Sequence, residues 1–242
     1  YQRFTDAFPT VHDLAEAERD AVLQQWEGLG YYSRARYLHE AAQTVVNEHG
    51  GTVPSTYDGL KSLKGIGPYT AAAVASIAFG KAHGVLDGNV IRVLTRVFAI
   101  EEDSTRSRTR RRLQALADAL VDPGDPGNAN QALMELGATV CTPRNPSCDA
   151  CVLEPVCEAA EAGNPEHYPV TPESKPVPHH DIAVGLVFDA EGRLLIQRRP
   201  DDAMLGGLWE FPGGKREEGE STEAACRREL QEELGITVKT DG

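Results

Sequence analysis

The segment CTPRNPSCDACVLEPVC, residues 141–157, holds four of the five cysteines in a chain of 242 residues. Cys141, Cys148, Cys151 and Cys157 follow the spacing Cys-x6-Cys-x2-Cys-x5-Cys. Structural zinc sites usually combine two close pairs of ligands with a longer gap, whereas iron–sulfur clusters are held by four thiolates in one local run. Prolines between the cysteines favour a loop that lets the thiols converge. The spacing therefore favours an iron–sulfur cluster, with structural zinc or unligated buried thiols as the alternatives.

The composition is that of an ordinary globular protein. Hydrophobic residues make up 40% of the chain and charged residues 25%, which is enough apolar material for a packed core. No apolar run reaches the roughly 18 residues that a membrane-spanning helix needs, and no secretory leader follows Tyr1. We therefore expect a cytoplasmic protein without a membrane partner. In that reducing setting clustered cysteines indicate metal ligands or redox groups rather than disulfides.

The net charge of −13 argues by itself against a nucleic-acid partner, because bulk acidity repels phosphate. The distribution of charge weakens that argument. Residues 1–157 hold 15 Lys and Arg against 19 Asp and Glu, so most of the acidity lies in the remainder. The run RSRTRRR, residues 106–112, is locally basic. It is either a solvated helix start or a surface that faces phosphate.

The hydrophobic pattern predicts a multidomain protein. Residues 1–162, which include the cysteine loop 141–157, show apolar residues at helical spacing and indicate an all-α domain. Residues 163–180 are rich in proline and lack apolar periodicity, which predicts a linker. Residues 181–242 predict two strands, over 181–189 and 193–199, followed by an amphipathic helix over 221–235. The last part therefore resembles the beginning of an α/β domain.

The stretch LKGIGPYTA, residues 63–71, places two glycines between two predicted helices. Gly65 and Gly67 would let a ligand approach the backbone, and the helix start that follows would offer amide donors to a phosphate. A plain helix–helix turn is the alternative. Further along, Asp87 lies in LDGNV at the start of another amphipathic helix. Asp87 is either an N-cap or a carboxylate held at the mouth of a cleft.

Together these motifs resemble the helix-hairpin-helix DNA glycosylases that carry a 4Fe-4S cluster. The matching features are LKGIGPYTA, the aspartate of LDGNV and the four-cysteine loop. Within that superfamily the stretches GLGYYSRAR, VLDGNVIRVLTR and ELGATVCTPRNPSC are similar to the MutY-type adenine glycosylases. The resemblance covers residues 1–160 and implies an all-α helix-hairpin-helix domain whose four cysteines hold the cluster.

The resemblance also implies roles for individual residues. Asp87 would stabilise the positive charge that develops on the deoxyribose as the N-glycosidic bond breaks. Asn89 would orient that carboxylate, and Tyr69 would lie beside it as a hydrogen-bonding group. The bifunctional lyases of the superfamily have a lysine at the position of Tyr69, which forms a Schiff base. Tyrosine cannot do so, and this implies a monofunctional enzyme.

The implied partner is double-stranded DNA with adenine opposite 8-oxoguanine, bound by a monomer. The adenine must leave the base stack to reach the site. Tyr31 matches the family's intercalating tyrosine, with ordinary core packing as the alternative. Gly65 and Gly67 would hold a phosphate through backbone amides, and Arg144 on the cysteine loop would face the DNA backbone.

The sequence departs from the family in its general acid. The family protonates the departing adenine with a glutamate from an early helix, and no stretch here matches that helix. Tyr1 aligns downstream of it, and Gly242 falls soon after the last predicted helix, so we expect the chain to be truncated at both ends. We therefore expect weak or no excision from this chain as it stands.

The stretch GGKREEGESTEAACRRELQEELGI, residues 213–236, fits the Nudix box and, with LWEFPGGK before it, resembles MutT-type pyrophosphohydrolases. Glu229, Glu232 and Glu233 share one helical face, where Mg²⁺ or Mn²⁺ could bind with substrate phosphates. A merely acidic solvated helix is the alternative. The preferred function is adenine glycosylase. The alternatives are a Nudix-type pyrophosphohydrolase of oxidised nucleotides with a DNA-binding helical domain, and a catalytically silent DNA-binding module.

Overall fold

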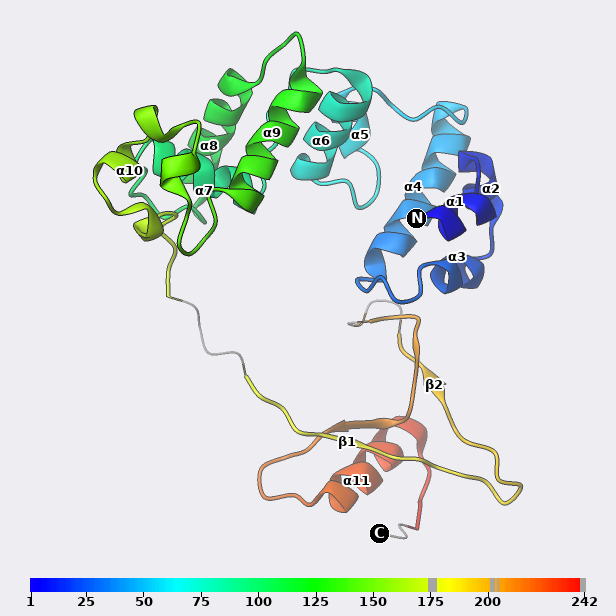
Figure 1. Ribbon diagram of the computed structural model, residues 1–242. Helices are drawn as coiled ribbons and strands as arrows, with labels where there is room; N and C mark the ends of the chain where they lie inside the picture. Colours follow the sequence, from blue (N-terminus) through cyan, green and yellow to red (C-terminus); the bar gives the residue numbers. More distant parts are fainter. Residues whose placement is uncertain (174–177, 201–202, 204, 240–242) are drawn as a thin grey trace. The chain divides into compact units, whose positions relative to one another are not determined.

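The computed structural model describes residues 1–173, 178–200, 203 and 205–239 (Figure 1). The chain divides into two compact units, one formed by Tyr1–Gly28 with Arg34–Glu173 and the other by Leu29–Ser33 with Ser174–Gly242. The first unit is helical, and the second contains the strands and one helix. The predicted combination of an all-α part followed by an α/β part is confirmed. No helix in the described part of the chain is long and apolar enough to cross a membrane.

The elements of the helical unit follow one another with short connections. They are α1 (Gln2–Ala7), α2 (Val11–Glu16), α3 (Arg19–Gln25), α4 (Ser33–His49), α5 (Tyr57–Lys61), α6 (Pro68–Phe79), α7 (Gly88–Val97), α8 (Ser107–Leu120), α9 (Pro126–Thr139) and α10 (Glu158–Glu161), with short 3₁₀ turns η1 (Cys148–Ala150), η2 (Glu154–Val156) and η3 (Pro165–His167). Residues at or next to the helix termini decide where many of these helices begin and end. α6, for example, starts with Pro68 at its first position and ends at Gly80 in the left-handed conformation.

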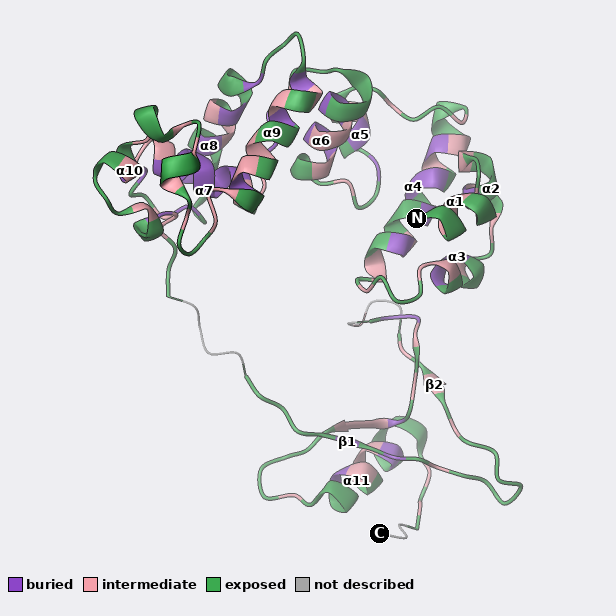
Figure 2. Ribbon diagram, in the orientation of Figure 1, coloured by how far each residue is buried: buried purple, intermediate pink, exposed green. Residues whose placement is uncertain are grey.

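Helix α7 is the centre of the helical unit. It packs against α8, α9 and α10, and most of its residues are buried (Figure 2). Val90, Ile91 and Leu94 of α7 form one apolar cluster with Leu113 and Ala117 of α8. Burying each large aliphatic side chain contributes roughly 1.5–3 kcal/mol, so this cluster holds α7 firmly in place. The N-terminus of α7, which carries the predicted catalytic aspartate, is therefore a rigid position.

Part of the segment predicted as a linker packs on the helical unit. Tyr168 is buried, and the carbonyl of Val170 accepts hydrogen bonds from the backbone N–H and hydroxyl of Ser104. Residues 174–177 of the same segment lie outside the described residues. The domain limits 1–162, 163–180 and 181–242 stay a prediction.

The second unit has two short antiparallel pairs and a helix. Strand β1 (Ile182–Val184) pairs with β4 (Gly213–Lys215), and β2 (Gln197–Arg198) pairs with β3 (Trp209–Glu210). The strands are shorter than the sequence predicts, although an isolated bridge between Phe188 and Leu194 joins the two predicted segments. Helix α11 (Thr222–Leu234) matches the predicted helix and packs against β1 and β4.

Candidate active site

Asp87 is the N-cap of α7 and holds both of its carboxylate oxygens in fixed directions. Oδ1 accepts the backbone N–H of Val90 at 2.7 Å, and Oδ2 accepts the side-chain amide of Asn89 at 3.1 Å. The N-cap alternative is therefore observed, and so is the orienting contact expected of Asn89. A carboxylate oxygen can accept more than one hydrogen bond, so capping does not prevent Asp87 from facing a substrate. The hydrogen bonds of the cap instead fix the orientation of the Asp87 carboxylate.

Arg92, which sequence reasoning missed, links Asn89 to the cysteine loop. Its Nη2 donates to Asn89 Oδ1 at 2.8 Å and to the carbonyl of Gly137 at 2.6 Å, and its Nε donates to the carbonyl of Cys141 at 2.7 Å. Burial lowers the pKa of this guanidinium. A Cβ on Gly137 would lie 2.6 Å from Cβ of Asn89, so the glycine allows α9 to approach α7 closely enough for these contacts.

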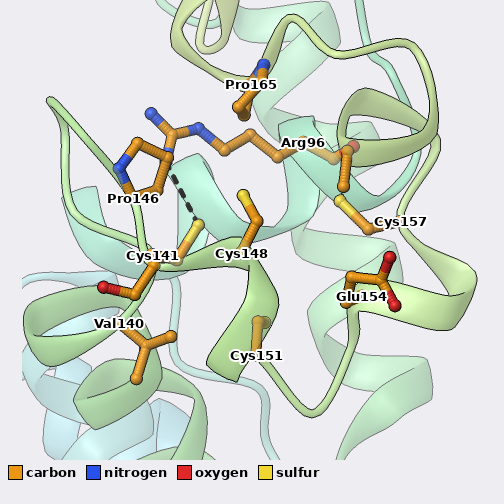
Figure 3. Close-up of a pocket in the computed structure, with 11 residues that line it drawn as sticks. Arg96, Val140, Cys141, Pro146, Cys148, Cys151, Glu154, Cys157 and Pro165 are labelled. Carbon is orange, nitrogen blue, oxygen red and sulfur yellow. Dashed lines mark hydrogen bonds between the residues drawn. The ribbon is translucent and has the colours of Figure 1, made fainter.

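The four cysteines of the loop line a single pocket (Figure 3). Arg96 crosses the same pocket, and its Nη1 donates to Sγ of Cys141 at 3.3 Å. Among the described residues, no three acidic, histidine or cysteine side chains lie close enough together to hold a single metal ion. Four thiols from one local run that line a single pocket fit the ligand set of an iron–sulfur cluster.

The charges in this pocket also suit a metal cluster. Burial, followed by the charges of Cys157, Cys141 and Cys151, raises the pKa of the Cys148 thiol, and Arg96 opposes this effect. Thiols crowded in this way bind protons unless cations replace them, and metal binding displaces protons from such ligands. The donor set therefore fits the predicted 4Fe-4S cluster.

Arg96 is a second arginine that the sequence reading missed. It is almost fully buried, with 1% of its surface exposed. Besides the sulfur, its guanidinium donates to the carbonyls of Thr142, Pro143 and Tyr168 at 2.8, 3.1 and 3.2 Å. Two arginines four residues apart in the largely apolar stretch NVIRVLTRV are a signal that could have revealed both residues.

The two glycines of the hairpin between α5 and α6 differ in backbone conformation and in the space around them. Gly65 has φ of +76°, and a Cβ there would lie 2.4 Å from Cβ of Tyr37 on α4. Gly67 caps α6 with φ of −82°, and a Cβ there would meet nothing within 4 Å. Packing and backbone conformation therefore require glycine at position 65. At position 67 there is room for a side chain, and the residue is exposed.

The other predicted site residues lie on the surface of their elements. Tyr69 is in the first turn of α6 and is 47% exposed, and among the described residues it makes no hydrogen bond to Asp87. Tyr31 is 79% exposed and has φ of +47°, a left-handed conformation that is uncommon for tyrosine. This exposure does not fit the alternative in which Tyr31 is an ordinary core residue. Arg144 is exposed on the cysteine loop.

The arginine run 106–112 is only partly neutralised. Arg112 bonds both carboxylate oxygens of Glu102 at 2.9 and 3.2 Å, and Arg106 pairs with Asp103 at 3.4 Å. The remaining arginines of the run are exposed and have no acidic partner in the described part of the chain. They are Arg108, Arg110 and Arg111.

In the second unit, Arg228 forms ion pairs with three carboxylates of the Nudix box. It donates to Glu220 and Glu229 at 3.0 Å and to Glu232 at 3.2 Å, while Glu233 accepts from Gln197 at 3.1 Å. The bonds to Arg228 lower the pKa of Glu220, and the bonds to Glu220 and Glu229 raise the pKa of Arg228. The three glutamates predicted to bind Mg²⁺ or Mn²⁺ are thus occupied by side-chain hydrogen bonds.

Two parts of the chain match known protein families. Residues 1–119 match the model of the HhH-GPD superfamily base excision DNA repair proteins, and residues 178–241 match the NUDIX domain. A thermostable thymine-DNA glycosylase of known structure is 32% identical, with a TM-score of 0.61 over 67% of this chain and 75% of that one. The chain belongs to the HhH-GPD superfamily. The HhH-GPD fold is seen again in a trapped endonuclease III–DNA complex, at 23% identity and a TM-score of 0.58 over 67% of this chain and 75% of that one.

Among curated HhH-GPD relatives, the adenine DNA glycosylase of Rattus norvegicus is 40% identical over 96% of this chain and 53% of its own length. The adenine DNA glycosylase of Arabidopsis thaliana is also 40% identical, over 88% of this chain and 39% of its own length. The chain thus spans about half the length of the rat relative and a smaller share of the plant relative.

Proposed function

We propose that this chain provides the catalytic core of a monofunctional adenine DNA glycosylase of base-excision repair. It acts as a monomer on double-stranded DNA and hydrolyses the N-glycosidic bond of adenine opposite 8-oxoguanine. The observation that carries the proposal is the fixed carboxylate of Asp87, whose two oxygens are held by Val90 N–H and Asn89. The identity with adenine DNA glycosylases over nearly the whole chain supports the choice of base.

The reaction depends on a negative charge, that of Asp87, which is in position before the glycosidic bond breaks. Positive charge develops on the deoxyribose as the bond to adenine breaks, and a carboxylate already aimed at that position stabilises it without further reorganisation. Asn89 keeps one oxygen of Asp87 in place, and Arg92 in turn holds Asn89. Tyr69 offers a hydroxyl and no amine, so no Schiff base with the sugar forms and the product is an abasic site.

Exposed residues of the chain would hold the DNA. Tyr31 offers an exposed ring that can fill the gap left by the extruded adenine. The amides near Gly67 and the start of α6 would bind a phosphate, and Arg144 would contact the backbone near the cysteine loop. The loop cysteines, Cys141, Cys148, Cys151 and Cys157, would hold the 4Fe-4S cluster, which when bound supplies a rigid covalent anchor for the loop.

A single-turnover assay tests this function. The substrate is a duplex with one adenine opposite 8-oxoguanine, and strand breakage is measured with and without alkali. Because no stretch of this chain matches the family's general-acid helix, we expect slow alkali-dependent breakage at that adenine, none opposite thymine, and none with Asp87→Asn. Breakage without alkali would contradict a monofunctional enzyme, and excision that survives Asp87→Asn would contradict the assigned site. Iron and acid-labile sulfide analysis tests the cluster, and finding zinc instead would exclude it.

A second candidate is hydrolysis of an oxidised nucleoside triphosphate by the second unit. The complete Nudix box and the match to the NUDIX domain favour it. Substrate with Mg²⁺ or Mn²⁺ would have to displace Arg228 from Glu229 and Glu232. Release of pyrophosphate from 8-oxo-dGTP in the presence of Mg²⁺, abolished by Glu229→Gln, would support this activity, and no release would exclude it.

A further inference from the structure

The segment that precedes Asp87 has no regular secondary structure. Residues 81–87 connect α6 to α7 without helix or strand. Such a connection would ordinarily be free to shift along its neighbours, because its backbone groups have no regular partners. Here His83, Gly84 and Val85 have their backbone groups bound by side chains from two other helices.

The first contacts come from α8. The N–H of Gly84 donates to Oδ1 of Asp118 at 2.8 Å, and the amide of Gln114 donates to the carbonyl of Gly84 at 2.8 Å. Gln114 also donates to the same oxygen of Asp118 at 3.0 Å, which ties the two side chains together. A Cβ on Gly84 would lie 2.4 Å from the backbone carbon of Ala117, so glycine is needed for this close approach.

The second set of contacts comes from Asn130 on α9, which is 1% exposed. Its Oδ1 accepts the N–H of Val85 at 2.9 Å. Its Nδ2 donates to the carbonyl of His83 at 2.8 Å and to the hydroxyl of Ser76 on α6 at 2.9 Å. Both hydrogens and the oxygen of this amide are therefore used, and Asn130 also links the connection to α6.

We propose that Gln114, Asp118 and Asn130 form a clamp that positions Asp87 for catalysis. The clamp ends at Val85, two residues before Asp87, while α7 fixes the residues that follow. Asp87 is thus held from both sides along the chain. The proposal deepens the proposed function, because it assigns to the clamp the placement of the charge that stabilises the reacting sugar.

The test uses a probe that does not require departure of adenine. A duplex carrying a cationic pyrrolidine in place of the target nucleoside, opposite 8-oxoguanine, mimics the charged sugar. The same duplex with a neutral tetrahydrofuran mimics its shape alone. Transition-state analogues bind in proportion to the stabilisation that the enzyme provides, so the ratio of the two Kd values reports the placement of the Asp87 charge.

We expect the parent chain to prefer the cationic duplex and Asp87→Asn to lose that preference. A displacement of 1 Å can cost about 100-fold in catalysis, so we expect Asp118→Ala to lower the ratio on the order of tenfold while leaving the Kd for the neutral duplex unchanged. Asp118→Asn should restore the ratio, because its one carbonyl oxygen can accept both hydrogen bonds. Gln131→Ala, on the exposed face of α9, is the matched control and should have no effect.

The outcomes separate the two proposals. A parent chain without preference for the cationic duplex would overturn the role of Asp87, and the clamp with it. A parent with preference that Asp118→Ala does not change would overturn the clamp alone. Equal loss for both duplexes would show a purely structural role and would also overturn the clamp. If thermal unfolding shows that Asp118→Ala is not folded, Gln114→Ala gives the same comparison.

Discussion

Arg96 donates a hydrogen bond from its guanidinium to the sulfur of Cys141 over 3.3 Å. The contact joins the end of α7 to the cysteine loop, while Asp87 caps the start of the same helix. Arg92, between them, bonds both Asn89 and the carbonyl of Cys141. One rigid helix therefore connects the candidate catalytic carboxylate to the loop that would hold the cluster.

Replacing Arg96 should reduce the metal content of the protein. Arg96→Gln removes the buried positive charge beside the thiolates and leaves carbonyls of the loop without donors. Each buried polar group left without a partner costs about 1–3 kcal/mol, so we expect loss of stability as well as of cluster. Iron and acid-labile sulfide per chain, with urea unfolding, measure both effects. Arg144→Gln, exposed on the same loop, is the control, and equal metal content in the two variants would contradict the prediction.

Two substitutions of Asp87 should separate its capping role from its charge. Asparagine caps helices about as well as aspartate, whereas alanine costs about 1 kcal/mol. We expect Asp87→Asn to keep most of the thermal stability of the parent, because its remaining oxygen can still cap the helix, and to lose excision, because the charge and the acceptor for Asn89 are removed. Asp87→Ala should lose both. Excision by Asp87→Asn at more than about a tenth of the parental rate, a difference of 1.4 kcal/mol, would argue against electrostatic stabilisation.

Replacement of Tyr31 should weaken binding to DNA through loss of its ring. Glycine accepts the left-handed backbone at this position, so Tyr31→Gly removes the ring without forcing the chain to rearrange. Stacking of a base on an aromatic ring is worth about 1–3 kcal/mol, which predicts at least about fivefold weaker binding to a duplex with adenine opposite 8-oxoguanine. Tyr31→Phe should bind as the parent does. Fluorescence anisotropy measures both, and unchanged affinity of Tyr31→Gly would exclude a wedge.

The hairpin glycines should respond in opposite ways to alanine. Gly65→Ala places a methyl group against Tyr37 in a left-handed conformation, so we expect loss of stability of about 1 kcal/mol or more. Gly67→Ala has free space and an ordinary φ, so the fold should tolerate it. Its methyl group would obstruct a phosphate held by backbone amides, and we expect weaker DNA binding. Thermal unfolding and DNA-binding titrations separate the two effects, and parental DNA affinity of Gly67→Ala would contradict a phosphate contact there.

Several features of the site could be predicted because they depend on neighbours in sequence. Asp87 caps the helix that follows it, and its bond to Val90 spans three residues. The four cysteines lie within one loop, so their spacing alone predicts that they converge. The strands of the second unit were predicted too long, since pairing across the sheet, and not only the apolar pattern, decides where a strand ends.

The order of helices, the cysteine loop and the position of Asp87 at a helix start could be read from the amino-acid sequence, because they follow from contacts over a few residues. The surroundings of these features depend on how distant parts of the chain pack together. Arg96 meets a sulfur 45 residues away, and Asn130 meets Val85 across the same separation. Side-chain hydrogen bonds over such separations depend on how helices pack, and packing brings together residues whose spacing along the chain carries no local periodic signal.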